Sequence, residues 1–355
     1  MEAAEFHPLE VAAVERLTDD AVAVTFEVPA DLAARFRYRP GQHVTVRASI
    51  EGEDVRRSYS ICANATTGTL RVGIKRLAGG TFSTWANESL EVGQELGVAA
   101  PVGEFTIESS RHEARHYGAI AAGSGITPVL SLISTALELE PESRFTLLFG
   151  NRESRTIMFL DELEGLKDRY PDRFHLIHVL SREEAIVPLF SGRLDAEKLA
   201  RLLDVVVDDA TVDNWYLCGP HEMVETARSV LTDRGVDVDS IHDELFFSGP
   251  PPEIPLEVDD QTDLPLVRFT LEGRTSQVRV PPQGAPILDY ALGVRRELPF
   301  SCRGGMCTSC RARVVDGEVR LDKNWSLTAE ELEAGQVLTC QSHPVGGDVE
   351  LTYDL

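Results

Sequence analysis

The sequence predicts a multidomain protein that consists of an antiparallel β-barrel, an α/β domain with a parallel sheet, and a smaller α+β domain. The chain of 355 residues is too long for a single compact core. Apolar and polar residues alternate in residues 9–107. From Tyr117 to about Phe247, apolar runs instead alternate with helical patterns. A proline-rich acidic stretch then precedes a region with closely grouped cysteines. We therefore expect domains at 1–109, 110–248 and 265–355, with a linker at 249–264.

The barrel is predicted from residues 9–107. These residues form short runs in which apolar and polar side chains alternate, such as Val22–Phe26 and His43–Val46. Glycine and Pro-Gly pairs separate the runs. Short alternating runs with such punctuation are typical of an antiparallel barrel.

The α/β domain is predicted from the stretch between Tyr117 and about Phe247. Its apolar runs alternate with helical patterns, which predicts a parallel sheet with crossover helices. The predicted strand and helix pairs are Gly118–Ala122 with Pro128–Leu139, Phe145–Phe149 with Phe159–Tyr170, Phe174–Leu180 with Ala196–Leu203, and Trp215–Leu217 with His221–Asp233.

The linker starts with Gly249 and three prolines and continues as an acidic run. Proline stiffness and charge repulsion make such a segment semi-rigid. The alternative is a surface loop inside a single domain.

The composition excludes several classes of protein. Asp and Glu number 58 against 34 Lys and Arg, so the net charge of −24 argues against nucleic-acid and anionic membrane partners. An acidic surface suits a basic protein partner or serves only solubility. The N-terminus lacks the apolar core of a signal peptide, and the uncharged stretch Tyr117–Leu137 contains a glycine turn and Pro128. We expect a soluble cytoplasmic protein.

Four cysteines form the clearest motif. They follow the pattern C-x4-C-x2-C with a distant fourth member, which is the spacing of plant-type [2Fe–2S] ferredoxins. Two glycines in the loop let the backbone point N–H groups at inorganic sulfides. A structural zinc site, which usually has two Cys-x2-Cys pairs, and unligated core cysteines are the alternatives. The predicted ligands of a β-grasp ferredoxin domain are Cys302, Cys307, Cys310 and Cys340.

Two turns that follow apolar strands and open helices are candidates for nucleotide binding. Glycines let the backbone approach a pyrophosphate, and a helix N-terminus favours the anion. The first turn is not a Rossmann fingerprint, because a proline stands where the third glycine belongs. A plain strand–turn–helix is the alternative. The residues concerned are Gly123, Gly125, Thr127 and Pro128 in the first turn and Cys218, Gly219 and Pro220 in the second.

A third group lies within the barrel region. An arginine beside a tyrosine and a serine can neutralise a phosphate, stack on a planar ring and hydrogen-bond a ring nitrogen. Taken alone, an arginine and a tyrosine on one strand face are the usual explanation. The group comprises Arg57, Ser58, Tyr59 and Ser60, followed by Lys75 and by Gly80, Thr81, Phe82 and Ser83.

The ordered set of these motifs resembles the ferredoxin–NADP reductase superfamily. With the cysteine domain appended, the chain is similar to the reductase components of bacterial multicomponent oxygenases, and in particular it resembles the reductases of phenylacetyl-CoA epoxidases. The likeness spans essentially the whole chain. The passages that carry it are 6–9, 82–85, 150–152, 178–183 and 337–341.

The resemblance implies a role for each motif. It implies that Arg57 meets the FAD pyrophosphate, Tyr59 packs on the flavin, Ser60 hydrogen-bonds near N5, and Gly80–Ser83 hold the FAD phosphates. It also places Thr127, the preceding glycines and Asn151 on the nicotinamide nucleotide, Cys218 beside the nicotinamide ring, and Glu244 with Phe246 or Phe247 at the flavin. Ser60, Cys218 and Glu244 are the expected catalytic residues. Ser58, Lys75, Pro128, Gly219 and Pro220 complete the predicted cofactor sites.

The coenzyme is predicted from Ser181 and Arg182, which follow the strand predicted at Phe174–Leu180. The resemblance places the 2′-phosphate of NADPH there, and a hydroxyl with a guanidinium suits a phosphate. NADPH is therefore expected rather than NADH. Because Glu183 and Glu184 follow directly, an ion pair of Arg182 with one of them is the alternative.

These features predict an oxidoreductase that passes electrons from NADPH to FAD, then to a [2Fe–2S] cluster and a partner oxygenase. Flavin belongs in the middle, because a nicotinamide releases two electrons together whereas a cluster accepts them singly. The resemblance implies that the partner is the diiron phenylacetyl-CoA epoxidase of aerobic phenylacetate degradation. An NADH-dependent reductase of a Rieske oxygenase, such as a steroid 9α-hydroxylase, and a non-catalytic redox-sensing module are the alternatives.

Overall fold

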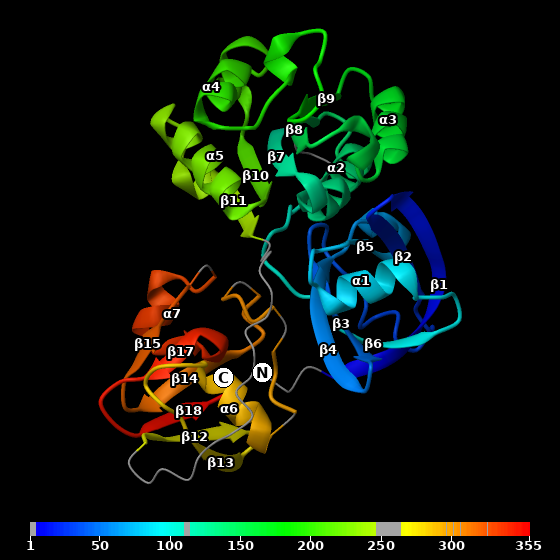
Figure 1. Cartoon of the computed structure of the whole chain (residues 1–355). Coiled ribbons are helices and arrows are strands. Elements are labelled where there is room, and N and C mark those ends of the chain that lie inside the picture. The colour runs from blue at the N-terminus through cyan, green and yellow to red at the C-terminus, as the bar shows by residue number, and fades with distance from the viewer. Residues whose placement is uncertain are drawn as a thin grey trace. The chain divides into compact units, whose positions relative to one another are not determined.

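The computed structural model describes residues 5–109, 114–245, 264–295, 297–300, 302–305, 307–324 and 326–355 (Figure 1). The chain divides into two compact units. The larger unit contains residues 7–55 and 59–248, and the smaller one consists mainly of residues 249–355. Phe246, Phe247 and all of the predicted linker except its last residue lie outside the described residues.

The first part of the larger unit is a six-stranded barrel, as the sequence predicts. The strand order is β4-β3-β6-β1-β2-β5, and the pairs β1/β2, β2/β5 and β3/β6 are antiparallel. A bridge between Ile61 and Val72 joins the two ends of this order, so that the sheet closes on itself. The elements are β1 (Phe6–Thr18), β2 (Ala21–Glu27), β3 (His43–Ile50), β4 (Glu53–Ser60), β5 (Leu70–Lys75), β6 (Glu95–Ala99) and helix α1 (Thr81–Glu88).

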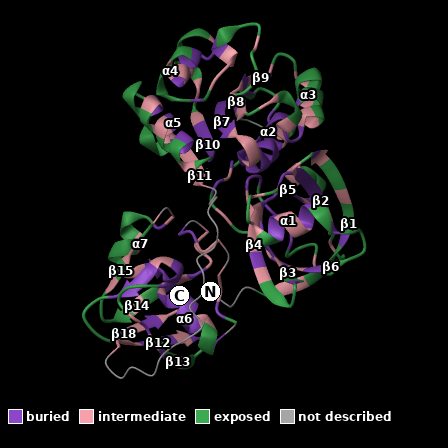
Figure 2. Ribbon diagram, in the orientation of Figure 1, coloured by how far each residue is buried: buried purple, intermediate pink, exposed green. Residues whose placement is uncertain are grey.

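Strand β2 shows why the alternating pattern specifies this barrel. Because successive side chains on a strand point to opposite faces, two sets of residues separate. Val22, Val24 and Phe26 belong to the barrel core, whereas Ala21 and Ala23 belong to a second apolar cluster. In Figure 2 the barrel strands accordingly carry exposed and intermediate residues as well as buried ones.

The second part of the larger unit is a parallel five-stranded sheet with helices. The strand order is β11-β10-β7-β8-β9, and every neighbouring pair is parallel. Side chains of α2 and α3 pack in one apolar cluster and those of α4 and α5 in another, so helices cover both faces (Figure 1). The bounds are β7 (His116–Ala122), α2 (Ile126–Leu139), β8 (Arg144–Asn151), α3 (Leu160–Arg169), β9 (Phe174–Leu180), α4 (Ala196–Val205), β10 (Asn214–Gly219), α5 (His221–Asp233) and β11 (Ile241–Leu245).

The order of the strands reverses between β7 and β10. From β7 the chain adds β8 and β9 on one side, and then β10 and β11 on the other. In open parallel sheets, ligands bind outside the carboxyl ends of the strands at such a reversal. Both predicted nucleotide turns begin there, because one follows β7 and the other follows β10.

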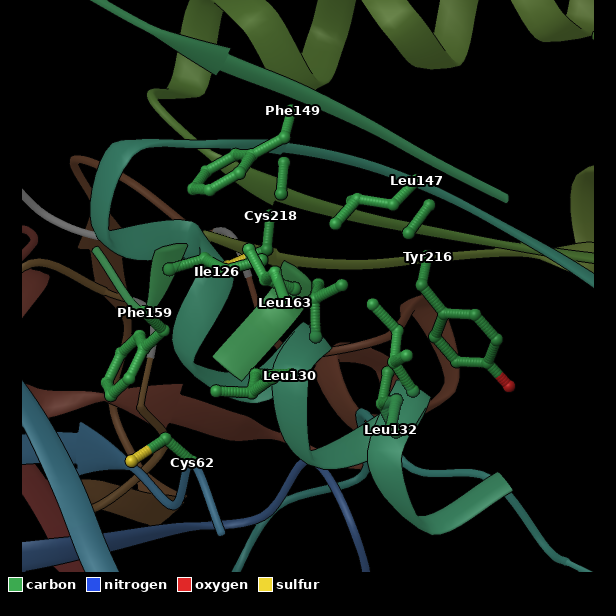
Figure 3. Packing of buried hydrophobic residues seen from close by; sticks show 14 of the residues in the cluster. Cys62, Ile126, Leu130, Leu132, Leu147, Phe149, Phe159, Leu163, Tyr216 and Cys218 are labelled. Carbon is green, nitrogen blue, oxygen red and sulfur yellow. The ribbon is translucent and has the colours of Figure 1, made fainter. Parts of the chain in front are cut away.

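A shared apolar core connects the barrel with the parallel sheet. It contains Cys62 from the barrel, Leu130 from α2 and Phe149 from β8 (Figure 3). Hydrogen bonds reinforce it, since Ser131 Oγ on α2 donates to the carbonyl of Ala63 at 2.6 Å. The two parts therefore form a single packed body.

The smaller unit has its own core and a mixed five-stranded sheet. The order is β13-β12-β18-β14-β16, in which β12 and β18 are parallel and the other pairs antiparallel. Helix α6 packs on this sheet through Ile287, Leu288 and Ala291, as in a β-grasp fold. The bounds are β12 (Leu266–Leu271), β13 (Arg274–Arg279), α6 (Ile287–Val294), β14 (Arg311–Asp316), β15 (Val319–Leu321), α7 (Ala329–Glu333), β16 (Gln336–Leu338), β17 (Ser342–Pro344) and β18 (Val349–Thr352).

Candidate cofactor sites

Three polar side chains from the barrel and the sheet meet in the larger unit. Ser60 ends β4 and is only 3% exposed, and its Oγ donates a 2.9 Å hydrogen bond to Glu244 Oε2 on β11. The other carboxylate oxygen, Oε1, lies 3.6 Å from Nδ1 of His43, the first residue of β3. Two of the predicted catalytic residues are thus in direct contact. His43 is an additional member that the sequence analysis did not single out.

Cys218 lies next to this group. Strand register pairs it with Glu244 on one side and with Ala121 on the other, and its side chain is fully buried. Burial raises the pKa of the Cys218 thiol, and the charge of Glu244 raises it further. Cys218 is therefore a neutral thiol at the carboxyl end of β10.

The first nucleotide turn packs tightly against the second. A Cβ added at Gly125 would lie 2.1 Å from the carbonyl oxygen of Cys218, so only glycine fits there. Thr127 is 2% exposed, and its Oγ1 donates to the carbonyl of Ser124 at 2.9 Å. Gly123 has φ of +55°, a backbone conformation that favours glycine. The two turns thus pack directly against each other.

The predicted FAD-phosphate segment begins a helix, as expected. Gly80 is the N-cap of α1 and provides no side-chain cap, which leaves the first N–H groups of the helix available to an anion. Phe82 is 1% exposed and packs on Tyr59, with ring centroids 5.5 Å apart. Ser83 Oγ accepts from the N–H of Leu77 at 3.0 Å. The buried Phe82 ring and the hydrogen bond of Ser83 therefore fix the position of this segment.

The remaining described members of the predicted flavin site lie on β4 and β5. Arg57, Ser58 and Tyr59 are consecutive residues of that strand and are all half-buried. Arg57 Nη1 donates to the carbonyl of Arg56 at 2.6 Å. Lys75 Nζ lies 3.1 Å from Asp20 Oδ1, so this lysine is held by an ion pair at the end of β5.

The candidate 2′-phosphate site lies at the carboxyl ends of β8 and β9. The N–H of Ser181 donates to the carbonyl of Asn151, and the N–H of Arg182 to the carbonyl of Arg152. Glu183 accepts from both N and Oγ of Ser154, at 2.7 and 3.2 Å. Within the described part of the chain, the Arg182 side chain forms no ion pair, so the predicted alternative partner does not engage it.

The cysteine loop in the smaller unit turns its N–H groups toward sulfur. Cys302 Sγ accepts from the N–H of Gly304 at 3.3 Å and from that of Cys307 at 3.4 Å. Cys307 Sγ accepts from the N–H of Cys302 at 3.3 Å. Arg303, with φ of +53°, adopts the left-handed conformation that permits this path. Such N–H···S bonds are typical of iron–sulfur sites.

The four thiols form two pairs. The neighbouring Cys307 thiol raises the pKa of the Cys302 thiol, and the neighbouring Cys340 thiol raises that of the Cys310 thiol. Cys310 and Cys340 are buried, whereas Cys302 and Cys307 are partly exposed. Over the described ranges, no three His, Cys, Asp or Glu residues are placed to hold a single metal ion. Two pairs of thiols fit a dinuclear [2Fe–2S] cluster, in which each iron takes two protein ligands.

Sequence reasoning missed His43 and Arg152. His43 follows a Pro-Gly-Gln turn at the start of a strand, and only the strand order brings it to Glu244. Arg152 stands in one of the passages that carry the resemblance, but its pairing with Arg182 depends on the register of β8 and β9. An arginine within two residues of the end of each of two adjacent strands is the signal that could have found it.

Comparison with known proteins agrees with this architecture. The model of the oxidoreductase FAD-binding domain matches residues 8–107, that of the oxidoreductase NAD-binding domain residues 119–229, and that of the 2Fe-2S iron-sulfur cluster binding domain residues 269–345. The chain belongs to the family of oxidoreductases that join a ferredoxin–NADP reductase module to a [2Fe–2S] ferredoxin domain. These proteins are reductase components that use a pyridine nucleotide, FAD and [2Fe–2S] to deliver electrons to a separate oxygenase component.

Particular relatives cover almost the whole chain. It is 41% identical over 349 residues to one of the subunits of the 1,2-phenylacetyl-CoA epoxidase of Escherichia coli, with 98% of each chain covered. It is 34% identical to "3-ketosteroid-9-alpha-monooxygenase, ferredoxin reductase component" of Mycobacterium tuberculosis, covering 98% of this chain and 95% of that one. The solved structure of phthalate dioxygenase reductase shares the fold, with a TM-score of 0.62, 21% identity and 98% of each chain covered.

No helix among the described residues is long and apolar enough to cross a membrane.

Proposed function

We propose that this chain takes electrons from NADPH and delivers them singly to the oxygenase component of a phenylacetyl-CoA epoxidase. The observation that carries the choice of partner is the 41% identity with the Escherichia coli protein, which extends over 98% of both chains. The aromatic thioester binds to the oxygenase in this proposal, so the reductase needs no site for it. A cytoplasmic location and the domain boundaries given above remain predictions.

Ser60, Glu244 and Cys218 are the residues that serve the first electron transfer. FAD, when bound, accepts a hydride as an electron pair and passes electrons on one at a time to the [2Fe–2S] cluster. Ser60 Oγ–H lies at the end of a line of polar side chains: it donates to Glu244, whose other carboxylate oxygen lies 3.6 Å from Nδ1 of His43. This line can hold or move a proton at the Ser60 hydroxyl. The buried Cys218 thiol and the tightly packed glycine turn leave no space for water beside them.

NADPH rather than NADH is the proposed donor. Ser181 provides a hydroxyl, and Arg182 and Arg152 provide two guanidinium groups on adjacent chain segments. Two arginines and a hydroxyl match a dianionic phosphate, which NADH lacks. Asn151 supports the site from β8, because its carbonyl accepts the N–H of Ser181 at 2.9 Å.

The four cysteines are the proposed cluster ligands, with one pair for each iron. Replacing Cys307 by serine tests the order of the carriers. We expect the full-length variant to reduce ferricyanide with NADPH at the rate of the unmodified protein, but to fail to reduce an oxygenase component. Undiminished delivery to the oxygenase would refute the proposal. Cys62→Ser is the matched control, since that thiol is buried in the core that α2 shares with the barrel and its replacement should leave delivery intact.

A second candidate is a reductase for a Rieske-type steroid hydroxylase, which the 34% identity with the mycobacterial protein supports. Supplying purified reductase to each oxygenase separates the two. Product formation with the phenylacetyl-CoA epoxidase and none with the ketosteroid hydroxylase supports the first proposal, and the reverse result supports the second.

A further inference from the structure

The cluster domain contains a buried ion pair directly beside the first cysteine. Asp289, on α6, is 3% exposed, and its Oδ1 lies 3.2 Å from Nη1 of Arg303, the residue after Cys302. The two side chains are 2% and 11% exposed. The second carboxylate oxygen, Oδ2, is buried and has no hydrogen-bond partner in the described structure.

A contribution to the stability of the folded protein does not explain this buried ion pair. Removing two charges from water costs as much as their attraction returns, and apolar residues usually serve equally well at buried positions. An unpaired buried oxygen adds to the cost. The pair therefore points to a role that depends on its position.

The surroundings of Arg303 fix both its side chain and its backbone. Its guanidinium lies over the ring of Phe300, 4.7 Å from the centroid. Its carbonyl accepts from Gln341 Nε2 at 2.9 Å, and Gln341 follows the fourth cysteine. Arg303 also has φ of +53°, which is uncommon for a residue with a side chain and must be held by its contacts.

This conformation directs the next N–H group to sulfur. Gly304 follows Arg303, and its N–H donates to Cys302 Sγ at 3.3 Å. Reduction adds one electron to a cluster and makes its sulfurs more negative. A fixed cation and an N–H···S bond both stabilise that state, so both raise the reduction potential.

We propose that Asp289 is a positioning residue that holds Arg303 and the loop after Cys302, and so raises the reduction potential of the cluster. The inference rests on the proposed assignment of the four cysteines as cluster ligands. The other titratable neighbour that acts on Asp289 is His343, whose Nε2 lies 2.9 Å from Asp322. Among the described residues, no hydrogen bond or ion pair joins Asp289 to a cysteine, so Asp289 acts through Arg303.

The test is the midpoint potential of the cluster in the full-length protein with its cofactors bound. For Asp289→Asn we expect the ratio of reduced to oxidised cluster at a fixed potential to fall about tenfold, which is about 59 mV for a one-electron couple. The sign is diagnostic, because removal of a negative charge by itself would raise the potential. Circular dichroism and electron paramagnetic resonance follow the cluster directly.

Two further variants complete the test. Arg303→Lys keeps the charge but loses the planar fork, so it should lower the potential as well. The double variant should fall no further than Asp289→Asn alone, because both substitutions break one interaction. Asp316→Asn is the matched control, since it removes one negative charge from an exposed position on β14 and should leave the potential unchanged.

An unchanged or raised potential in Asp289→Asn, with wild-type iron content, would overturn the positioning role. If Asp289→Asn fails to fold, an unshifted potential in Arg303→Lys has the same meaning. Absence of a [2Fe–2S] signal in the unmodified protein would instead refute the cluster assignment, and this inference with it.

Discussion

Gly125 offers a sharp test of the close contact between the turns that follow β7 and β10. It is the N-cap of α2 and has φ of −62°, a value that alanine adopts freely, so Gly125→Ala adds only a Cβ atom. That atom would lie 2.1 Å from the Cys218 carbonyl oxygen and 2.4 Å from its carbon. Ordinary contact begins at 3.4 Å, so the two turns would have to separate by about 1.3 Å.

A movement of this size affects both binding and stability. Misplacing reacting groups by about 1 Å can cost roughly 100-fold in rate, and overpacking costs about 1–3 kcal/mol. We expect Gly125→Ala to lower kcat/KM for NADPH about 100-fold in ferricyanide reduction. Its thermal midpoint should fall by several degrees.

Variants of two other glycines distinguish the effect of this close contact from the effect of backbone conformation. Gly165→Ala, within α3, meets nothing within 4 Å and should stabilise the helix by about 0.5–1 kcal/mol with unchanged kcat/KM. Gly123→Ala also has open space, but its φ of +55° should cost about 1–2 kcal/mol. If Gly125→Ala had the same kcat/KM and thermal midpoint as the unmodified protein, the close approach of the two turns would be refuted.

Three further predictions concern single side chains. Ser60→Ala removes the hydroxyl that donates to Glu244, and stopped-flow measurement should show flavin reduction about 100-fold slower; an unchanged rate would exclude Ser60 from this step. Arg182→Ala should raise KM for NADPH roughly 10- to 100-fold and leave KM for NADH unchanged, because a charged hydrogen bond contributes about 1.5–3 kcal/mol; equal effects on both coenzymes would contradict the phosphate site. Burial lowers the pKa of His116 to about 4 from 6.5, so the unfolded chain binds more protons in this interval. Stability due to His116 is therefore complete above pH 6.5 and declines as the pH falls toward 4, and His116→Gln should reduce this dependence in thermal melts; identical pH profiles would count against it.

Where the local sequence signals are strong, the sequence predicted the bounds of the helices and strands accurately. The structure has a strand at Phe174–Leu180 and a helix at His221–Asp233 with the predicted bounds, because apolar periodicity and flanking breakers mark both. Helix α2 starts at Ile126 rather than Pro128, since the glycine turn before it is a short 3₁₀ segment. The motif spacing of the cysteines was enough to predict the iron–sulfur domain.

Contacts that depend on strand order could not be predicted from local pattern. Ser60 and Glu244 are 184 positions apart, and β11 is a five-residue edge strand without a strong apolar signal. His43 reaches Glu244 only because β3 and β4 are neighbours in the barrel. The ion pair of Asp289 and Arg303 likewise requires α6 to pack over the cysteine loop. These are long-range consequences of topology.

The apolar core that α2 shares with the barrel limits how this protein can be dissected. A fragment ending near residue 109 would leave Ala21, Ala23 and Cys62 facing water, and a fragment starting there would expose one side of α2. Either piece should aggregate when produced alone. The iron–sulfur module has its own apolar core within residues 267–353, so a fragment that begins at about residue 264 should fold when it is produced alone.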